Sequence, residues 1–122
     1  TFGGTPIAMA AVTATLEMML ELDAPAKAAA AGEYLMRRLR EATRDLPNVA
    51  EIRGKGLLVG IQCTHPVADA VAELHRRGLL VVTAGPEVIR LLPNLLVTRE
   101  EIDEAVEKIA AVLRERVAGT VG

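Results

Sequence analysis

The sequence predicts an α+β fold, in which helices cover one face of a small, largely antiparallel sheet and a long apolar connector helix precedes that sheet. After residue 24, the periodic segments follow in the order helix, two strands, helix, two strands and helix. The connections between paired strands are short and contain glycine or proline, which favours antiparallel hairpins. The first and last of these helices carry an apolar stripe, and such stripes are buried against a sheet or another helix.

The first segment, residues 1–23, has the pattern of a glycine turn, TFGGTP (1–6), followed by a helix at 6–22. The turn places Gly3 and Gly4 before a suitable N-cap and a proline that fits the first helical turn. It is either a plain capped turn, which is the commoner case, or an anion site at a helix N-terminus. The helix is apolar on nearly every side, so we expect a connector that is buried against another domain.

The remaining residues, 24–122, are expected to form a small α+β domain that begins with an amphipathic helix at 25–46. Apolar side chains recur along it at three- and four-residue spacing; they are Ala28, Ala31, Leu35, Leu39, Ala42 and Leu46. Its basic side chains alternate with acidic ones, and they are Arg37, Arg38, Arg40 and Arg44. We therefore expect a solvated face there rather than a docking patch.

Four strands and two further helices complete the predicted domain. The strands are expected at 49–53 and 57–63, joined by GKG (54–56), and at 79–83 and 88–92, joined by AGP (84–86). A short helix begins at Pro66 and ends at Gly78. The last helix starts at a capping box, TREE (98–101), and its core stripe is Ile102, Val106, Ile109, Leu113 and Val117.

Composition and charge exclude several classes of partner. The 122 residues carry 14 basic and 16 acidic side chains, a net charge of -2 and only 2% aromatic residues. A nucleic-acid binder normally has a basic excess and stacking aromatic rings, so we expect no nucleic-acid partner. No apolar stretch is long and uncharged enough for a bilayer, so we expect no membrane partner. The single cysteine, Cys63, suits a reducing compartment such as the cytoplasm.

Sequence spacing alone identifies no catalytic or metal site. Cys63 lies in an apolar run, where a buried hydrophobe is the expected role and a catalytic thiol the less expected one. His65 and His75 have no acidic or cysteine partner at metal-ligand spacing. Arg90 interrupts the apolar strand VIRLL (88–92), where an arginine is usually paired with a carboxylate. That carboxylate belongs either to a protein Glu or Asp, the commoner case, or to a substrate.

Four motifs occur along the chain in a fixed order: TFGGTP (1–6), IRGKGLLVG (52–60), AGPEVIRLLP (84–93) and TREEIDEA (98–105). Together they resemble the C-terminal third of class-III, fold type I, pyridoxal-phosphate-dependent aminotransferases. The resemblance covers essentially the whole chain and is closest to the acetylornithine and ornithine branch, which serves arginine biosynthesis. It implies a large cofactor domain before Thr1 and a small C-terminal domain, joined by a long helix that corresponds to 6–22.

The resemblance also implies site residues, a cofactor and a partner subunit. Thr1 is similar to a threonine that hydrogen-bonds the phosphate of pyridoxal 5'-phosphate in the neighbouring subunit of a homodimer, with Gly3 and Gly4 beside it. Arg90 is similar to an arginine that meets a carboxylate, either of the substrate or of an active-site glutamate. The lysine that binds the cofactor covalently would precede Thr1. We therefore expect no catalytic residue and no metal ligand within these 122 residues.

The function that the resemblance implies is transfer of an amino group from N-acetylornithine, or a related ω-amine, to 2-oxoglutarate with pyridoxal phosphate as cofactor. The chain is expected to be a fragment that is inactive by itself. Two alternatives remain at this point. One is a free-standing, non-catalytic α+β domain for ligand binding or dimerisation, and the other is a family member that has lost its activity.

Overall fold

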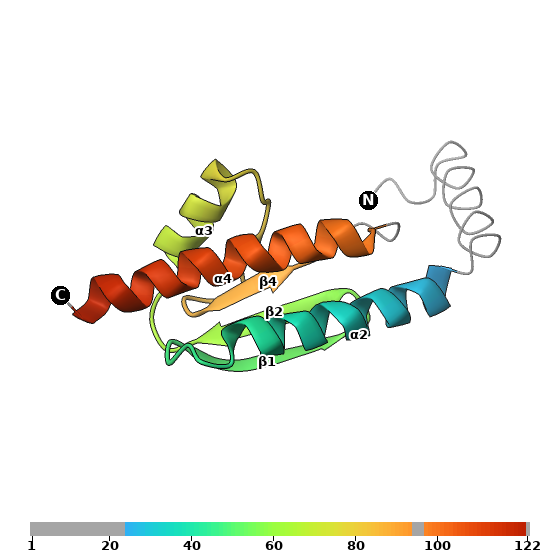
Figure 1. The fold of residues 1–122 in the computed structure, drawn as a ribbon, viewed down its shortest axis with the longest axis horizontal. Coiled ribbons are helices and arrows are strands. Elements are labelled where there is room, and N and C mark those ends of the chain that lie inside the picture. The colour runs from blue at the N-terminus through green and yellow to red at the C-terminus, as the bar shows by residue number, and fades with distance from the viewer. Residues whose placement is uncertain (1–23, 94–96, 122) are drawn as a thin grey trace, which may run out of the picture.

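The computed structural model describes residues 24–93 and 97–121, and it has the predicted α+β architecture (Figure 1). The elements, in chain order, are α2 (Ala24–Thr43), β1 (Val49–Lys55), β2 (Leu58–Cys63), α3 (Ala68–Arg76), β3 (Val82–Thr83), β4 (Val88–Leu91) and α4 (Arg99–Val121). The predicted connector helix at 6–22 and the turn before it lie outside the described residues. Within the described ranges, no helix combines the length and the apolar character needed to cross a membrane.

The four strands form one antiparallel sheet in the order β1-β2-β4-β3. Strands β2 and β4 are central, and β3 pairs with β4 at the edge through only two residues. The predicted strand at 79–83 is therefore too long. The backbone N–H of Leu79 donates to the carbonyl oxygen of Leu74 at 2.9 Å, so the end of α3 uses the group that a longer strand would need.

The β1–β2 hairpin turns at Gly56 and Leu57, one residue or two later than predicted. Lys55 pairs with Leu58, so Gly54 and Lys55 belong to β1. Gly56 has a φ of 57°, a conformation that favours glycine. A side chain at Gly54 would lie 2.5 Å from the carbonyl oxygen of Leu58. Close approach of the two strands, rather than a turn, therefore requires glycine at position 54.

Helices α2 and α4 lie side by side across one face of the sheet, and α3 packs against α4 (Figure 1). The sheet contributes one side of the core, made of Ile52, Val59, Ile61, Cys63, Ile89 and Leu91. The helices contribute the other side, which includes the predicted stripe residues Leu35, Leu39, Ile102, Val106, Ile109 and Leu113. The expected one-sided layer is thus confirmed, and it is built almost entirely from aliphatic side chains.

Helix α4 begins at the predicted capping box. The backbone N–H of Glu101 donates to Thr98 Oγ1 at 3.2 Å, and the backbone N–H of Thr98 donates to Glu101 Oε1 at 3.0 Å. Each side chain thus satisfies a backbone donor that the helix start would leave unpaired. The reciprocal pair fixes where α4 starts.

A polar cluster joins α2 to α4 at the edge of the core. Asp103 Oδ1 accepts hydrogen bonds from the Tyr34 hydroxyl at 2.6 Å and from Arg38 Nε at 3.1 Å. The guanidinium carbons of Arg37 and Arg99 lie 5.3 and 4.9 Å from the centroid of the Tyr34 ring, within cation–π range. Arg38 of α2 and Arg99 of α4 therefore hold the two helices together, whereas the contact between Arg37 and Tyr34 lies within α2.

Replacing Asp103 by asparagine is expected to lower the free energy of unfolding at neutral pH. The difference in this free energy between wild type and the variant should become smaller as the pH falls below about 4. Hydrogen bonds from Tyr34 and Arg38 lower the pKa of Asp103 below its usual value. A lowered carboxyl pKa stabilises the folded state above the unfolded pKa, and this contribution is lost as the pH falls through the folded pKa. Urea unfolding of wild type and variant between pH 7 and pH 2.5 measures this difference.

Glu107→Gln is the matched control for Asp103→Asn, because Glu107 lies on the same helix and is exposed. It should change the free energy of unfolding little at any of these pH values. A difference between Asp103→Asn and wild type that stays constant over the whole pH range would show that the ionised Asp103 carboxylate is not what joins the helices.

Candidate functional site

We call the face of the sheet opposite the helices the open face, and it carries several charged side chains. The open-face positions of β1, β2 and β4 are Glu51, Arg53, Lys55, Leu58, Gly60, Gln62, Val88 and Arg90. These positions alternate along the strands with the buried residues of the core, as side chains on opposite faces of a sheet must. Arg53 is paired with Gly60, Gly60 with Arg90 and Arg90 with Val82. Gly60 therefore has one arginine on each side, Arg53 on β1 and Arg90 on β4.

The open face is hollowed at this row. The hollow, which we call the Arg90 depression, has a volume of about 410 Å³ and is lined by Arg53, Gly54, Lys55, Leu58, Val59, Gly60, Ala84, Val88 and Arg90. Three of its lining residues are cations, and no lining residue is a carboxylate. A concave surface with one sign of charge concentrates ions of the opposite sign. The depression is therefore suited to an anionic group.

Arg90 is exposed on β4, and its environment differs from the expectation for an arginine buried in an apolar strand. Its neighbours Ile89 and Leu91 face the core, which leaves Arg90 on the open face. No Asp or Glu in residues 24–93 or 97–121 forms an ion pair with it. The more common alternative, a protein carboxylate, is thus not found among the described residues. Because the guanidinium is solvated, it needs no partner for stability.

Arg53 is the second arginine of the row, and sequence reasoning gave it no role beyond its place in a motif. Its Nη2 donates to Gln62 Oε1 at 3.2 Å, and its Nη1 lies 3.4 Å from Glu51 Oε2. Gln62 Nε2 donates in turn to the carbonyl oxygen of Cys63 at 3.0 Å. The alternation of strand β1 could have revealed that Arg53 shares a face with Arg90, but only with the strand register known.

The cysteine and histidine predictions can be compared with the structure directly. Cys63 is buried, and desolvation raises the pKa of its thiol to about 11. The thiolate that a nucleophile needs is therefore disfavoured, and the role of buried hydrophobe is confirmed. His75 Nε2 lies 2.7 Å from the carbonyl oxygen of Val81, and His65 lies beside the hydroxyl of Thr64. In the described part of the chain, no three His, Cys, Asp or Glu residues come together in a possible metal site.

Among the described residues, no lysine has the setting that a covalent cofactor anchor needs. A lysine that forms a Schiff base is activated in a desolvated setting. Lys27 and Lys55 are exposed, and Lys108 Nζ pairs with Glu104 Oε1 at 2.9 Å. The predicted phosphate ligands Thr1, Gly3 and Gly4 lie outside the described residues, so their role stays a prediction.

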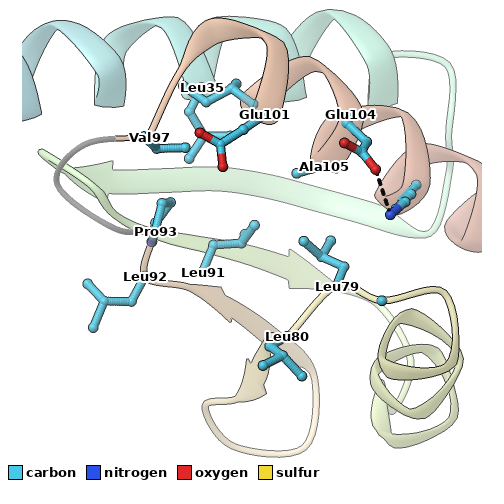
Figure 2. Close-up of a pocket in the computed structure, with 13 residues that line it drawn as sticks. Leu35, Leu79, Leu80, Leu91, Leu92, Pro93, Val97, Glu101, Glu104 and Ala105 are labelled. Atoms are coloured by element: carbon cyan, nitrogen blue, oxygen red, sulfur yellow. Dashed lines mark ion pairs between the residues drawn. The ribbon is translucent and has the colours of Figure 1, made fainter.

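A second hollow lies on the helix side, between α4 and the segments around β3 and β4, and it is shown in Figure 2. Its walls are mostly aliphatic, with Leu35, Leu79, Leu80, Leu91, Leu92 and Pro93 among the lining residues. The charged groups in it are Glu101, Glu104 and Lys108, and the last two pair with each other. Glu101 caps α4. This hollow therefore lacks a free charged group to fix a polar ligand, whereas the Arg90 depression has one.

Comparison with known proteins gives consistent results over nearly the whole chain. The family model for class-III aminotransferases matches residues 1–113. The chain is 52% identical over 118 residues to the acetylornithine aminotransferase of Bacillus subtilis (strain 168), covering 97% of this chain and 30% of the relative. It is 42% identical over 113 residues to the ornithine aminotransferase of an Exiguobacterium species, covering 93% of this chain and 28% of the relative. The chain thus spans about a third or less of the length of these relatives.

Solved structures of similar proteins share the fold. A Bacillus anthracis aminotransferase superposes with a TM-score of 0.87 at 30% identity, over 94% of this chain and 29% of that one. The acetylornithine aminotransferase from Elizabethkingia anophelis gives a TM-score of 0.85 at 27% identity, over 94% and 30%. The sheet that carries the Arg90 depression is therefore a shared feature of a larger architecture.

Proposed function

The chain belongs to the class-III aminotransferase family, and on that premise we propose that it is the C-terminal part of an enzyme that moves an amino group from N-acetylornithine, or a related ω-amine, to 2-oxoglutarate. The carrying observation is Arg90, a solvated guanidinium in a cationic depression with no protein carboxylate beside it among the described residues. Both the keto acid and the amino-acid products of such a reaction carry carboxylates. The planar fork of an arginine binds such a group through two parallel hydrogen bonds.

The rest of the proposal follows the family. Pyridoxal phosphate would supply the electron sink for the chemistry, and this chain would contribute Thr1, Gly3 and Gly4 to the phosphate of the neighbouring subunit in a homodimer. Residues 1–23 would be the connector and 24–122 the small domain of a cytoplasmic enzyme. Arg90 would hold a carboxylate of the substrate, or of a glutamate elsewhere in the enzyme. A free-standing, non-catalytic domain is not favoured, because the relatives that match nearly the whole chain are aminotransferases.

The test is the whole protein that contains this chain. We expect the coding sequence upstream of Thr1 to encode a cofactor domain with the Schiff-base lysine. The purified whole protein, loaded with pyridoxal phosphate, should convert 2-oxoglutarate to glutamate with one of N-acetylornithine, ornithine or 4-aminobutyrate as donor. Comparing the three donors identifies the ω-amine, and no transfer from any of them would refute the proposal. The 122-residue chain mixed with pyridoxal phosphate should show no protein-bound cofactor absorbance and no turnover.

A further inference from the structure

Gly60 is the one glycine in residues 24–93 that neither backbone conformation nor packing requires. Three of the others have a positive φ, namely Gly56, Gly78 and Gly85. At the remaining two, Gly32 and Gly54, backbone atoms occupy the space that a side chain would need. A Cβ atom at Gly60 would lie 3.5 Å from Val88 Cγ1 and 3.9 Å from the carbonyl oxygen of Arg53. These are ordinary van der Waals distances, so a side chain would fit.

The position of Gly60 makes its lack of a side chain costly. It lies in β2, a central strand, and is paired on one side with Arg53 and on the other with Arg90. Glycine weakens the interior of a strand, because it loses more conformational freedom on folding and packs no side chain. A glycine inside a strand often marks a bulge, a tight bend or a place where a ligand or another backbone approaches closely.

The two arginines beside Gly60 are held differently. Arg53 is anchored, because Gln62 Oε1 accepts a hydrogen bond from it while Gln62 Nε2 is fixed on the carbonyl oxygen of Cys63. Arg90 has no such anchor among the described residues. Their Cα atoms are two strand spacings apart, about 10 Å, and both side chains are long enough to reach a group that lies over Gly60. Glu51 neutralises part of the Arg53 charge through an exposed pair at 3.4 Å.

We propose that Gly60 is the floor of a carboxylate seat, in which the anion lies against the β2 backbone between Arg53 and Arg90, and that Gln62 positions Arg53 for it. The proposal rests on the proposed function for the role of Arg90, and adds to it Gly60, Arg53 and Gln62. Any side chain at position 60 would lift the anion away from both guanidiniums. The carboxylate comes either from a small dicarboxylate such as 2-oxoglutarate or from a glutamate side chain of the whole protein.

Titration of the 122-residue chain with glutarate at constant ionic strength, followed by the NMR shifts of the amides of residues 53, 60 and 90, tests the seat. Wild type should show saturable shifts, and Gly60→Val and Arg53→Gln should each weaken glutarate binding roughly 10-fold. The affinity of Gly60→Ala for glutarate should lie between those of Gly60→Val and wild type. Val82→Ile is the control, because it adds one methyl group on the other side of Arg90. Its affinity for glutarate should stay within about twofold of that of wild type.

Unfolding in urea decides whether any effect is structural. Gly60→Ala and Gly60→Val should be at least as stable as wild type, since a Cβ has room. A stable Gly60→Val that binds glutarate normally would overturn the seat, and so would a wild type without saturable shifts. Destabilisation by Gly60→Ala would also overturn it, because Gly60 would then have a packing role.

The titration measures binding and involves no amino transfer. An inactive whole protein would therefore refute the proposed function but would not test the carboxylate seat. In an active whole protein, inhibition by glutarate distinguishes the two sources of the carboxylate. If glutarate competes with 2-oxoglutarate in wild type and does so about 10-fold more weakly in Gly60→Val, the seat takes a free dicarboxylate. If glutarate binds the 122-residue chain but does not inhibit the whole protein, a glutamate side chain of the protein occupies the seat, and either result supports the seat.

Discussion

Replacing Arg90 by glutamine in the whole protein is expected to lower kcat/KM for 2-oxoglutarate roughly 100-fold. A guanidinium that binds a carboxylate through two charge-assisted hydrogen bonds contributes about 3 kcal/mol, and 1.4 kcal/mol corresponds to a factor of ten. Glutamine keeps a hydrogen-bond donor but loses both the charge and the fork. The initial rate of glutamate formation at varied 2-oxoglutarate concentration measures the loss.

Three further variants separate a direct contact from a general charge effect. Arg90→Lys keeps the charge without the fork and should recover only part of the activity. Lys55→Gln removes another cation of the Arg90 depression and should cost less than about threefold, because an exposed charge acts only through screened attraction. Arg90→Gln should also unfold in urea like wild type, since Arg90 is exposed and makes no ion pair among the described residues. Equal losses in Arg90→Gln and Lys55→Gln would contradict the assignment.

The elements that sequence predicted correctly are those set by short-range chemistry. The apolar stripes of α2 and α4 follow from helical spacing. Their larger members within the helices are buried as expected, apart from the half-buried Val117, and the alanines of the α2 stripe are also half-buried. Leu46, predicted as part of the first stripe, is buried but lies beyond the end of α2. The capping box at Thr98 and Glu101 is formed by two residues three positions apart, so its hydrogen bonds could be predicted before the fold was known. Boundaries were less accurate. Strand β3 is shorter than predicted because a hydrogen bond from Leu79 to the end of α3 competes with the ladder.

The arrangement of the candidate site could not be predicted in the same way, because it depends on strand register. Arg53 and Arg90 are far apart in the chain and share a row only because both pair with Gly60. A shift of one residue in either pairing would move one arginine to the other face. The sequence also suggested a carboxylate partner for Arg90, and whether one lies nearby is a property of the folded sheet. Thr1, Gly3 and Gly4 remain predictions.

The largest effect on stability is expected from Gly32→Ala in α2. Gly32 is buried where α2 crosses the β1–β2 hairpin, and a Cβ atom there would overlap the carbonyl oxygen of Gly56 and lie 2.5 Å from its carbonyl carbon. Both obstructing atoms belong to the backbone, so relief requires the helix and the hairpin to move apart. We expect a loss of about 2–3 kcal/mol in the free energy of unfolding. Alanine is the better helix former by about 1 kcal/mol, which offsets only part of the clash.

The midpoint and slope of urea unfolding measure this loss, and Gly60→Ala provides the matched control. It is the same chemical change at a described glycine where a Cβ meets its neighbours at 3.5 Å or more, so its stability should equal or exceed that of wild type. Gly56→Ala has free space but a positive φ, so it should cost about 1 kcal/mol through the backbone alone. If Gly32→Ala unfolds at the wild-type midpoint, the close packing of α2 on the hairpin is not what requires glycine there. If it is as destabilising as expected, the absence of a side chain at Gly32 is what allows the hairpin that presents Arg53 to pack against α2.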